Sequence, residues 1–228
     1  MRAVRSIHGR ALPLDRRDVD TDQIIPNGWL KRVERTGFAA GLFEAWRRDP
    51  AFVLNDPRYA GATVLLAGAN FGCGSSREHA VWALEEHGFR AIVAPSFADI
   101  FRANCARVGL VAAALPEEAV ERLMRAVERD PALAIAVDVA SRTVTAAGET
   151  HPFPLDDFTR TRLLEGLDDI GLTLRHVEAI ARYEAMRPAH LPRASEEETA
   201  TRRPPVTSVA TPDERSDARR AKRLRVSD

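Results

Sequence analysis

The middle of the chain alternates short apolar runs with stretches whose apolar residues recur at helical spacing. Residues 63–67 (TVLLA) form a β-branched and aliphatic run, which is typical of a strand that is buried on both faces. A glycine-rich turn follows at residues 68–74, and residues 75–87 then show the apolar spacing of a helix. Gly88 ends this predicted helix, because glycine readily adopts the left-handed conformation of a helix C-cap.

The same alternation continues through a second helix and two further strands. Residues 91–94 and 110–114 predict short strands, and residues 97–107 between them predict a helix. The order strand, helix, strand, helix, strand favours an α/β fold with a largely parallel sheet and right-handed crossovers. The apolar residues of the second helix that we expect in the core are Phe97, Ile100 and Phe101.

A third helix, a hairpin and a last helix are predicted after these strands. Pro116 opens the third helix, which has one apolar face. Residues 135–139 and 142–145 alternate with period two on either side of a short turn, so a hairpin is expected there. The last helix is predicted over residues 175–187.

Composition divides the chain into two parts. Residues 193–228 contain one leucine, no aromatic residue and many charged, proline, serine and threonine residues. Such an arginine-rich tail cannot bury enough apolar surface to offset the entropy lost on ordering, so we expect it to be disordered. Residues 1–192 are expected to form a single domain.

Charge and cysteine content argue against several classes of function. The 33 basic and 33 acidic residues give no net charge, so neither nucleic acid nor a membrane is expected as a partner. The apolar runs are far shorter than the roughly 20 residues that span a bilayer, and the N-terminus lacks the apolar stretch of a signal peptide. The two cysteines form no disulfide framework, so we expect a cytoplasmic protein.

The segment with the most chemistry is residues 70–79 (NFGCGSSREH), at the predicted junction between a strand and a helix N-terminus. Its glycines permit unusual backbone angles, and the unpaired amides of a helix start stabilise an anion. Ser75 and Glu78 have the spacing of a capping box. Arg77 can bind a carboxylate through two nitrogens, and a serine alkoxide stabilised by amides can exchange a proton with carbon.

Three familiar glycine motifs do not fit this segment. A phosphate-binding P-loop needs a lysine after its glycines, and a dinucleotide fingerprint needs a glycine where Arg77 stands. A nucleophile elbow has the order G-x-S-x-G, whereas this segment reads G-C-G-S-S. The residues alone therefore indicate either an anion site or simply a well-capped helix.

Four stretches of sequence, taken together, resemble one family. They are DVDTDQIIP at residues 18–26, RTGF at 35–38, FGCGSSREHAVWALEEHGFRAIVAPSFADIF at 71–101 and GLDDIGLTLRHVEAIARYEAMRP at 166–188. In this order they resemble the small subunit of bacterial 3-isopropylmalate dehydratase and, more distantly, the swivelling C-terminal domain of aconitase. The resemblance covers residues 1–190 and implies a single swivelling β/β/α domain with a mainly parallel central sheet.

The resemblance implies an activity and roles for particular residues. The family is a hydro-lyase that converts 2-isopropylmalate to 3-isopropylmalate through 2-isopropylmaleate, in leucine biosynthesis. Its serine base matches Ser75, and Ser76 and Arg77 match positions that bind substrate carboxylate. Asp22 matches the aspartate that orients or charge-balances the site.

A further carboxylate-binding arginine is implied in the loop after Asp22. The alignment makes Arg35 the first choice and Arg32 the second. The surrounding residues 30–36 are expected to help recognise the isopropyl group of the substrate.

The cysteine count implies a divided active site. The family reaction uses a [4Fe-4S] cluster held by three cysteines, with one iron open as a Lewis acid. This chain has two cysteines and no C-x-x-C, so it cannot hold that cluster alone. We therefore expect no cofactor on this chain, a cluster on a separate large subunit, and a heterodimer or higher heteromer that binds a small diacid.

Two alternatives stay open. The small subunit of a homoaconitase, or of a citraconate or dimethylmalate hydratase, would share the fold and differ chiefly within residues 30–36. A non-catalytic module would use the same loop to capture an anionic ligand. Cys73 and His79 are interpreted as packing residues, although a thiol near a helix N-terminus can be activated and a histidine can act as a base.

Overall fold

The computed structural model describes residues 1–34, 36–188, 190 and 191. The chain divides into two units, Met1–Val177 and Glu178–Asp228. The predicted tail at residues 193–228 lies outside the described residues, and a domain boundary after residue 192 stays a prediction. The sheet described below belongs to the first unit.

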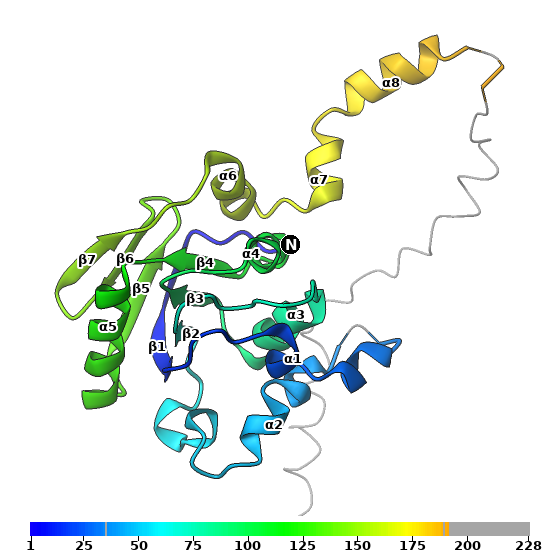
Figure 1. Cartoon of the computed structure of the whole chain (residues 1–228). Helices are drawn as coiled ribbons and strands as arrows, with labels where there is room; N and C mark the ends of the chain where they lie inside the picture. Colours follow the sequence, from blue (N-terminus) through cyan, green and yellow to red (C-terminus); the bar gives the residue numbers. More distant parts are fainter. Residues whose placement is uncertain (35, 189, 192–228) are drawn as a thin grey trace, which may run out of the picture. The chain divides into compact units, whose positions relative to one another are not determined.

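A seven-stranded sheet forms the centre of the first unit, with the strand order β4-β3-β2-β1-β5-β6-β7 (Figure 1). The strands from β4 to β1 run parallel to one another, whereas β1 pairs antiparallel with β5 and the last strands continue antiparallel. The strands are β1 (Ser6–Leu14), β2 (Val64–Ala67), β3 (Ala91–Ala94), β4 (Val111–Ala114), β5 (Ala134–Asp138), β6 (Thr143–Ala146) and β7 (Glu149–Pro152).

The parallel half confirms the predicted alternation of strands and helices. Every residue of β2 and β3 is buried, as expected from their unbroken apolar sequences. Helix α3 (Glu78–His87) connects β2 to β3, and helix α4 (Asp99–Val108) connects β3 to β4. Because parallel strands share one carboxyl edge, the loops that follow β1, β2 and β3 meet at that edge.

Strand β1 lies in the middle of the sheet, yet the sequence pattern did not predict it. Its sequence, SIHGRALPL, contains Gly9 and Pro13, which both weaken a strand prediction. The strand pairs with β5 through residues 6–10 and with β2 through residues 11–14. Pro13, which has no amide hydrogen to donate, therefore lies where only one side of β1 is paired.

The antiparallel half contains the predicted hairpin. Strands β5 and β6 pair through Val137 and Val144, and the Asp138 carboxylate accepts a 2.6 Å hydrogen bond from the Ser141 amide in the turn. Strand β7 extends this hairpin into a meander that the sequence pattern did not predict. Helix α5 (Glu117–Arg129) packs against β1, β2 and β3, and its buried face includes the expected apolar residues Val120, Leu123, Met124 and Val127.

Short helices complete the described chain. The remaining α-helices are α1 (Thr21–Ile24), α2 (Glu44–Arg47), α6 (Asp157–Glu165), α7 (Asp169–Leu174) and α8 (Val177–Met186). Turns of 3₁₀ helix occur at Asn27–Lys31, Phe38–Gly41, Val53–Asn55 and Pro57–Tyr59.

The predicted start of helix α3 is wrong. The helix begins at Glu78, and its N-cap Arg77 is extended and forms no side-chain cap. Ser75 and Glu78 therefore do not form a capping box. Instead, the Ser75 carbonyl accepts a hydrogen bond from the Thr21 hydroxyl. Ser75 is therefore held by the chain segment after β1 and not by the helix.

The predicted last helix is also only partly correct. A single helix over residues 175–187 was expected, whereas α8 begins at Val177 and α7 precedes it. The amides of Arg175 and His176 bond to carbonyls three residues earlier, at Leu172 and Thr173, and this tightening ends α7.

Replacing Gly68 with alanine tests the contact between the chain segments after β1 and β2. A Cβ at Gly68 would lie 2.4 Å from the carbonyl oxygen of Arg16, so the free energy of unfolding should fall by about 2–3 kcal/mol. Gly28→Ala is the control, because a Cβ there meets nothing within 4 Å and should change stability by about 0.5 kcal/mol or less. Urea unfolding of both variants measures this, and equal midpoints would show that the close contact is absent.

Candidate active site

The loops at the carboxyl edge of the sheet are bonded to one another. The amide of Gly72 donates to the Val19 carbonyl at 2.8 Å, which joins the segments after β2 and β1. The amide of Phe71 donates to the Ser96 carbonyl at 3.0 Å, which joins the segments after β2 and β3. Residues 70–77, here named the serine loop, are therefore held from both sides.

Left-handed backbone angles shape the serine loop. Gly72 and Gly74 have φ angles of 77° and 86°, which confirms that these glycines adopt angles closed to most residues. A Cβ on Gly72 would also lie 2.1 Å from Cγ of Phe101 in α4. Asn70 and Asp18 are left-handed as well, and the Asn70 side-chain amide donates to the Asp18 carboxylate at 2.8 Å. This local hydrogen bond helps to offset the strain of the two angles.

A pocket of about 260 Å³ lies between the serine loop and the start of α4. Ser75 and Ser76 are both exposed on it, so a ligand in the pocket can reach their hydroxyls. Ile100 was expected in the core, but this prediction is wrong, because the side chain lines the pocket and is 56% exposed. The pocket lining includes Thr21, Ser75, Ser76, Arg77, Ile100 and Asn104.

Arg77 and Asp22, which are 55 positions apart in the sequence, form an ion pair beside this pocket. The Arg77 side chain is 12% exposed and that of Asp22 is 55% exposed. The same arginine nitrogen, Nη1, also lies 3.5 Å from the Ile25 carbonyl oxygen. The structure thus brings Asp22 together with the three predicted site residues of the serine loop, which are Ser75, Ser76 and Arg77.

Thr21 is a residue of the site that the sequence reasoning missed. Its hydroxyl donates to the Ser75 carbonyl at 2.8 Å and its amide donates to the Cys73 carbonyl at 3.0 Å. Its position directly before Asp22 was the signal in the sequence, but only the contact with the serine loop gives Thr21 a role.

The structure does not bring Arg32 to the serine loop. Its guanidinium lies 5.2 Å from the centre of the Trp29 ring and 3.7 Å from the Glu34 carboxylate. Arg32 lines a separate hollow that shares no residue with the serine-loop pocket. Arg35, the first choice for this role, lies outside the described residues.

The surroundings of Cys73 and His79 agree with packing roles. Burial raises the pKa of the Cys73 thiol, and the nearby Asp20 and Asp18 carboxylates raise this pKa further, so the thiol is not activated. The His79 ring packs against Phe38 and Trp82, with centroid distances of 5.2 Å and 4.7 Å.

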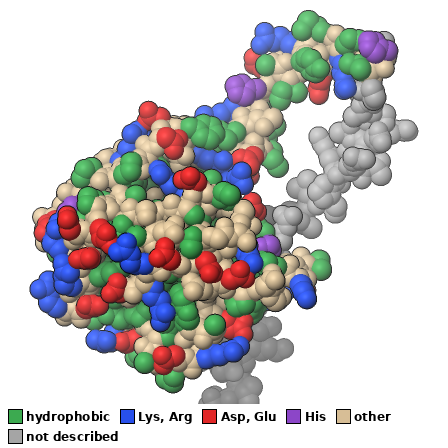
Figure 2. Space-filling model, in the orientation of Figure 1, with side chains coloured by type: hydrophobic (Ala, Val, Ile, Leu, Met, Phe, Trp, Pro, Cys, Tyr) green, Lys and Arg blue, Asp and Glu red, His purple; other side chains and the backbone are tan. Residues whose placement is uncertain are grey.

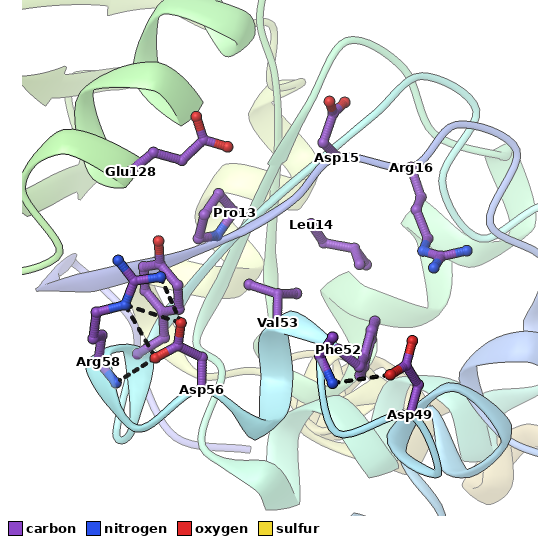
Figure 3. Close-up of a pocket in the computed structure, with 12 residues that line it drawn as sticks. Pro13, Leu14, Asp15, Arg16, Asp49, Phe52, Val53, Asp56, Arg58 and Glu128 are labelled. Atoms are coloured by element: carbon purple, nitrogen blue, oxygen red, sulfur yellow. Dashed lines mark hydrogen bonds and ion pairs between the residues drawn. The ribbon is translucent and has the colours of Figure 1, made fainter.

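A larger pocket, about 520 Å³, lies beside the end of β1 (Figure 3). Most of its charged groups already have partners. Arg58 pairs with Asp56 at 2.6 Å, and the Arg16 guanidinium lies 4.4 Å from the centre of the Trp46 ring. The Asp49 carboxylate accepts a 2.9 Å hydrogen bond from the Ala51 amide. Its lining shares no residue with the serine-loop pocket. This pocket therefore adds no group to the candidate active site.

The described residues do not offer a metal centre. Among them no group of three histidine, cysteine, aspartate or glutamate side chains is placed to hold a metal ion. Cys105 is fully buried in α4 and Cys73 is half-buried in the serine loop, so the cysteines of this chain do not fit an iron–sulfur cluster.

Basic and acidic side chains are interspersed over the face of the molecule that Figure 2 shows, in keeping with their equal numbers. Within the described part of the chain, none of the helices has the length and apolar character that crossing a membrane requires.

Comparison with known proteins identifies the family. The Aconitase C-terminal domain matches residues 1–118, LeuD_N matches residues 121–157, and the C-terminal domain of the 3-isopropylmalate dehydratase small subunit matches residues 169–194. A 3-isopropylmalate dehydratase small subunit from Frankia alni is 63% identical over 190 residues, which are 83% of this chain and 97% of that protein. This chain belongs to the 3-isopropylmalate dehydratase small-subunit family.

Other relatives agree with this assignment to the dehydratase small subunits. One from Rubrobacter xylanophilus, with the same name, is 58% identical over 193 residues, which are 85% of this chain and 99% of that protein. The crystal structure of a 3-isopropylmalate dehydratase from Methanocaldococcus jannaschii is 28% identical, with a TM-score of 0.56, and the match covers 78% of this chain and 99% of that chain. The resemblance and the α/β fold class inferred from the sequence are both confirmed.

The pH dependence of Cys73 alkylation tests the electrostatics of the serine loop. Because burial and two carboxylates favour the neutral thiol, iodoacetamide labelling of the dehydratase small subunit should titrate with a pKa above that of free cysteine. Cys73→Ser is the control, since the remaining Cys105 is fully buried. Labelling that titrates below free cysteine would instead indicate an activated thiol.

Proposed function

We propose that the serine loop and Asp22 form the half of a dehydratase active site that this chain contributes. The chain is a small subunit of 3-isopropylmalate dehydratase, a hydro-lyase of leucine biosynthesis. The enzyme converts 2-isopropylmalate to 3-isopropylmalate through 2-isopropylmaleate. The observation that carries the proposal is the convergence of Ser75, Ser76 and Arg77 on one pocket, with Asp22 paired to Arg77.

Ser75 is the base in this proposal. As an alkoxide, its oxygen takes the proton from the carbon next to the hydroxyl-bearing carbon, and the C–H electron pair forms the new double bond while the hydroxyl leaves with its own pair. Addition of water in the opposite orientation gives the isomer, and Ser75 then returns a proton to carbon. Helix α3 begins three residues later, at Glu78, and its unpaired N–H groups favour negative charge near this end.

Arg77 and Ser76 bind a substrate carboxylate. The bonds from Arg77 to Asp22 and to the Ile25 carbonyl both use Nη1. Guanidinium has five N–H donors in a planar fork, so Nε and Nη2 carry donors for a carboxylate. Asp22 orients this guanidinium, and its negative charge balances the arginine when no substrate is bound.

A second carboxylate contact comes from the loop after α1. Arg35 is the first candidate, and Arg32 is the second. The described position of Arg32, over Trp29, gives it no contact with the serine-loop pocket, so Arg32 would serve only if residues 30–36 rearrange around the substrate.

A separate large subunit supplies the other half of the site and holds the [4Fe-4S] cluster in this proposal. The whole chain has two cysteines, and the two proteins form a heterodimer or a higher heteromer. The cytoplasm is the compartment that suits these cysteines, because they are not joined by a disulfide.

Replacing Ser75 with alanine tests the base assignment. In enzyme reconstituted anaerobically with a cluster-loaded large subunit, kcat should fall by about 10²–10⁴-fold, because the proton acceptor is lost. Absorbance of the unsaturated intermediate measures the rate, and Ser6→Ala, at an exposed serine of β1, is the control. A variant that keeps the normal rate would rule out Ser75 as base and favour a non-catalytic anion-binding role.

Replacing Arg77 with lysine tests the carboxylate anchor. Lysine cannot bind a carboxylate through two parallel N–H donors, so KM for 2-isopropylmalate should rise by about tenfold or more. Arg17→Lys, in an exposed pair with Glu117, is the matched control. An unchanged KM would contradict the anchor role, and preferential turnover of homocitrate or citrate by the unmodified enzyme would assign it to a related hydro-lyase.

A further inference from the structure

The position of Ser75 depends on restraints from outside its own segment. Ser75 lies before the first residue of helix α3, so no helical hydrogen bond holds it. The preceding residue, Gly74, has a φ of 86°, and glycine at such a position allows the chain to pivot. An exposed base at this point therefore needs a hydrogen bond from another segment to fix its backbone.

Thr21 forms hydrogen bonds to the backbone on both sides of Gly74. Its amide donates to the Cys73 carbonyl at 3.0 Å, before the glycine, and its hydroxyl donates to the Ser75 carbonyl at 2.8 Å, after it. Thr21 is 2% exposed. Water therefore competes little for either bond, and a bond in a site of low dielectric is stronger than its equivalent in water.

Thr21 is itself fixed by a small helix. Asp20 and Gln23 form a capping box around α1: the Gln23 amide donates to the Asp20 carboxylate at 2.8 Å, and the Asp20 amide donates to the Gln23 side-chain oxygen at 3.0 Å. The next residue, Asp22, pairs with Arg77. One turn of helix thus contacts both the base and the carboxylate anchor of the serine loop.

We propose that Thr21 is a positioning residue that sets the orientation of Ser75 for proton transfer. The inference rests on the proposed function, because it takes Ser75 as the base. A hydrogen bond to the Ser75 carbonyl fixes the peptide plane that follows Ser75 and so limits rotation of the serine about its backbone. Small errors in the position of a base slow proton transfer, whereas carboxylate binding by Arg77 depends on a different contact, with Asp22.

The test compares Thr21→Val, which keeps the shape and loses the hydroxyl, with Thr21→Ser, which keeps the hydroxyl. In the reconstituted enzyme, Thr21→Val should lower kcat by about 10- to 100-fold and change KM less than about twofold, and Thr21→Ser should restore most of kcat. Thr63→Val is the matched control, because the Thr63 hydroxyl is buried without a hydrogen-bond partner and its loss should not reduce activity.

A second measurement uses the small subunit alone and does not depend on activity. Cys73 lies within the serine loop, so its alkylation by iodoacetamide reports how firmly the loop is held. Thr21→Val should speed this alkylation several-fold, while Thr21→Ser and Thr63→Val should match the unmodified chain. These substitutions are uncharged, so a change in rate reflects access to the thiol rather than a nearby charge.

The two measurements separate failure of this inference from failure of the proposed function. A normal kcat for Thr21→Val in active enzyme, or a fall in kcat that Thr21→Ser does not reverse, would overturn the positioning role. If Ser75→Ala keeps its rate, the base assignment fails and the positioning role fails with it, whatever the alkylation rates. Faster alkylation and lower kcat in Thr21→Val, both reversed in Thr21→Ser, would support the inference.

Discussion

The candidate active site depends on the pairing of two chain segments, residues 18–22 after β1 and the serine loop after β2. Backbone hydrogen bonds join the segments at two points: the Gly72 amide donates to the Val19 carbonyl at 2.8 Å, and the Thr21 amide donates to the Cys73 carbonyl at 3.0 Å. Side chains add the Thr21 bond to Ser75 and the ion pair between Asp22 and Arg77. Because β1 and β2 are parallel neighbours, both segments leave the sheet at the same edge, and the pairing follows from the topology.

This pairing places strained backbone beside exposed polar groups, which is typical of functional sites. Left-handed angles at non-glycine residues cost on the order of 1–3 kcal/mol each, and Asp18 and Asn70 both have such angles. Every residue of β2 and β3 is buried, so the packing of this half of the sheet can offset that cost. Ser75, Ser76 and Ile100 meanwhile stay exposed on the pocket. Such an open face fits the proposal that a second protein completes the site.

The family comparison and the geometry support different parts of the functional conclusion. Relatives of 58% and 63% identity establish the dehydratase small-subunit family, but they say nothing about which atoms contact one another in this chain. The geometry supplies those contacts: Arg77 lines the serine-loop pocket, whereas Arg32 lines a different hollow. Because the chain has two cysteines, one of them fully buried in α4, we propose that a partner holds the metal.

The sequence alone determined the parallel strands β2 to β4, the helices between them and the serine loop, because each leaves a local pattern of apolar spacing or glycine. It also determined the family, through long ordered motifs that include Ser75 and Arg77. Only the tertiary structure decided that β1 is central, that α3 begins at Glu78 and that Ile100 is exposed. The hydrogen bond from Thr21 to Ser75 joins residues that are 54 positions apart. Such a contact produces no periodic pattern in the sequence, because it forms only when the parallel strands bring their carboxyl ends together.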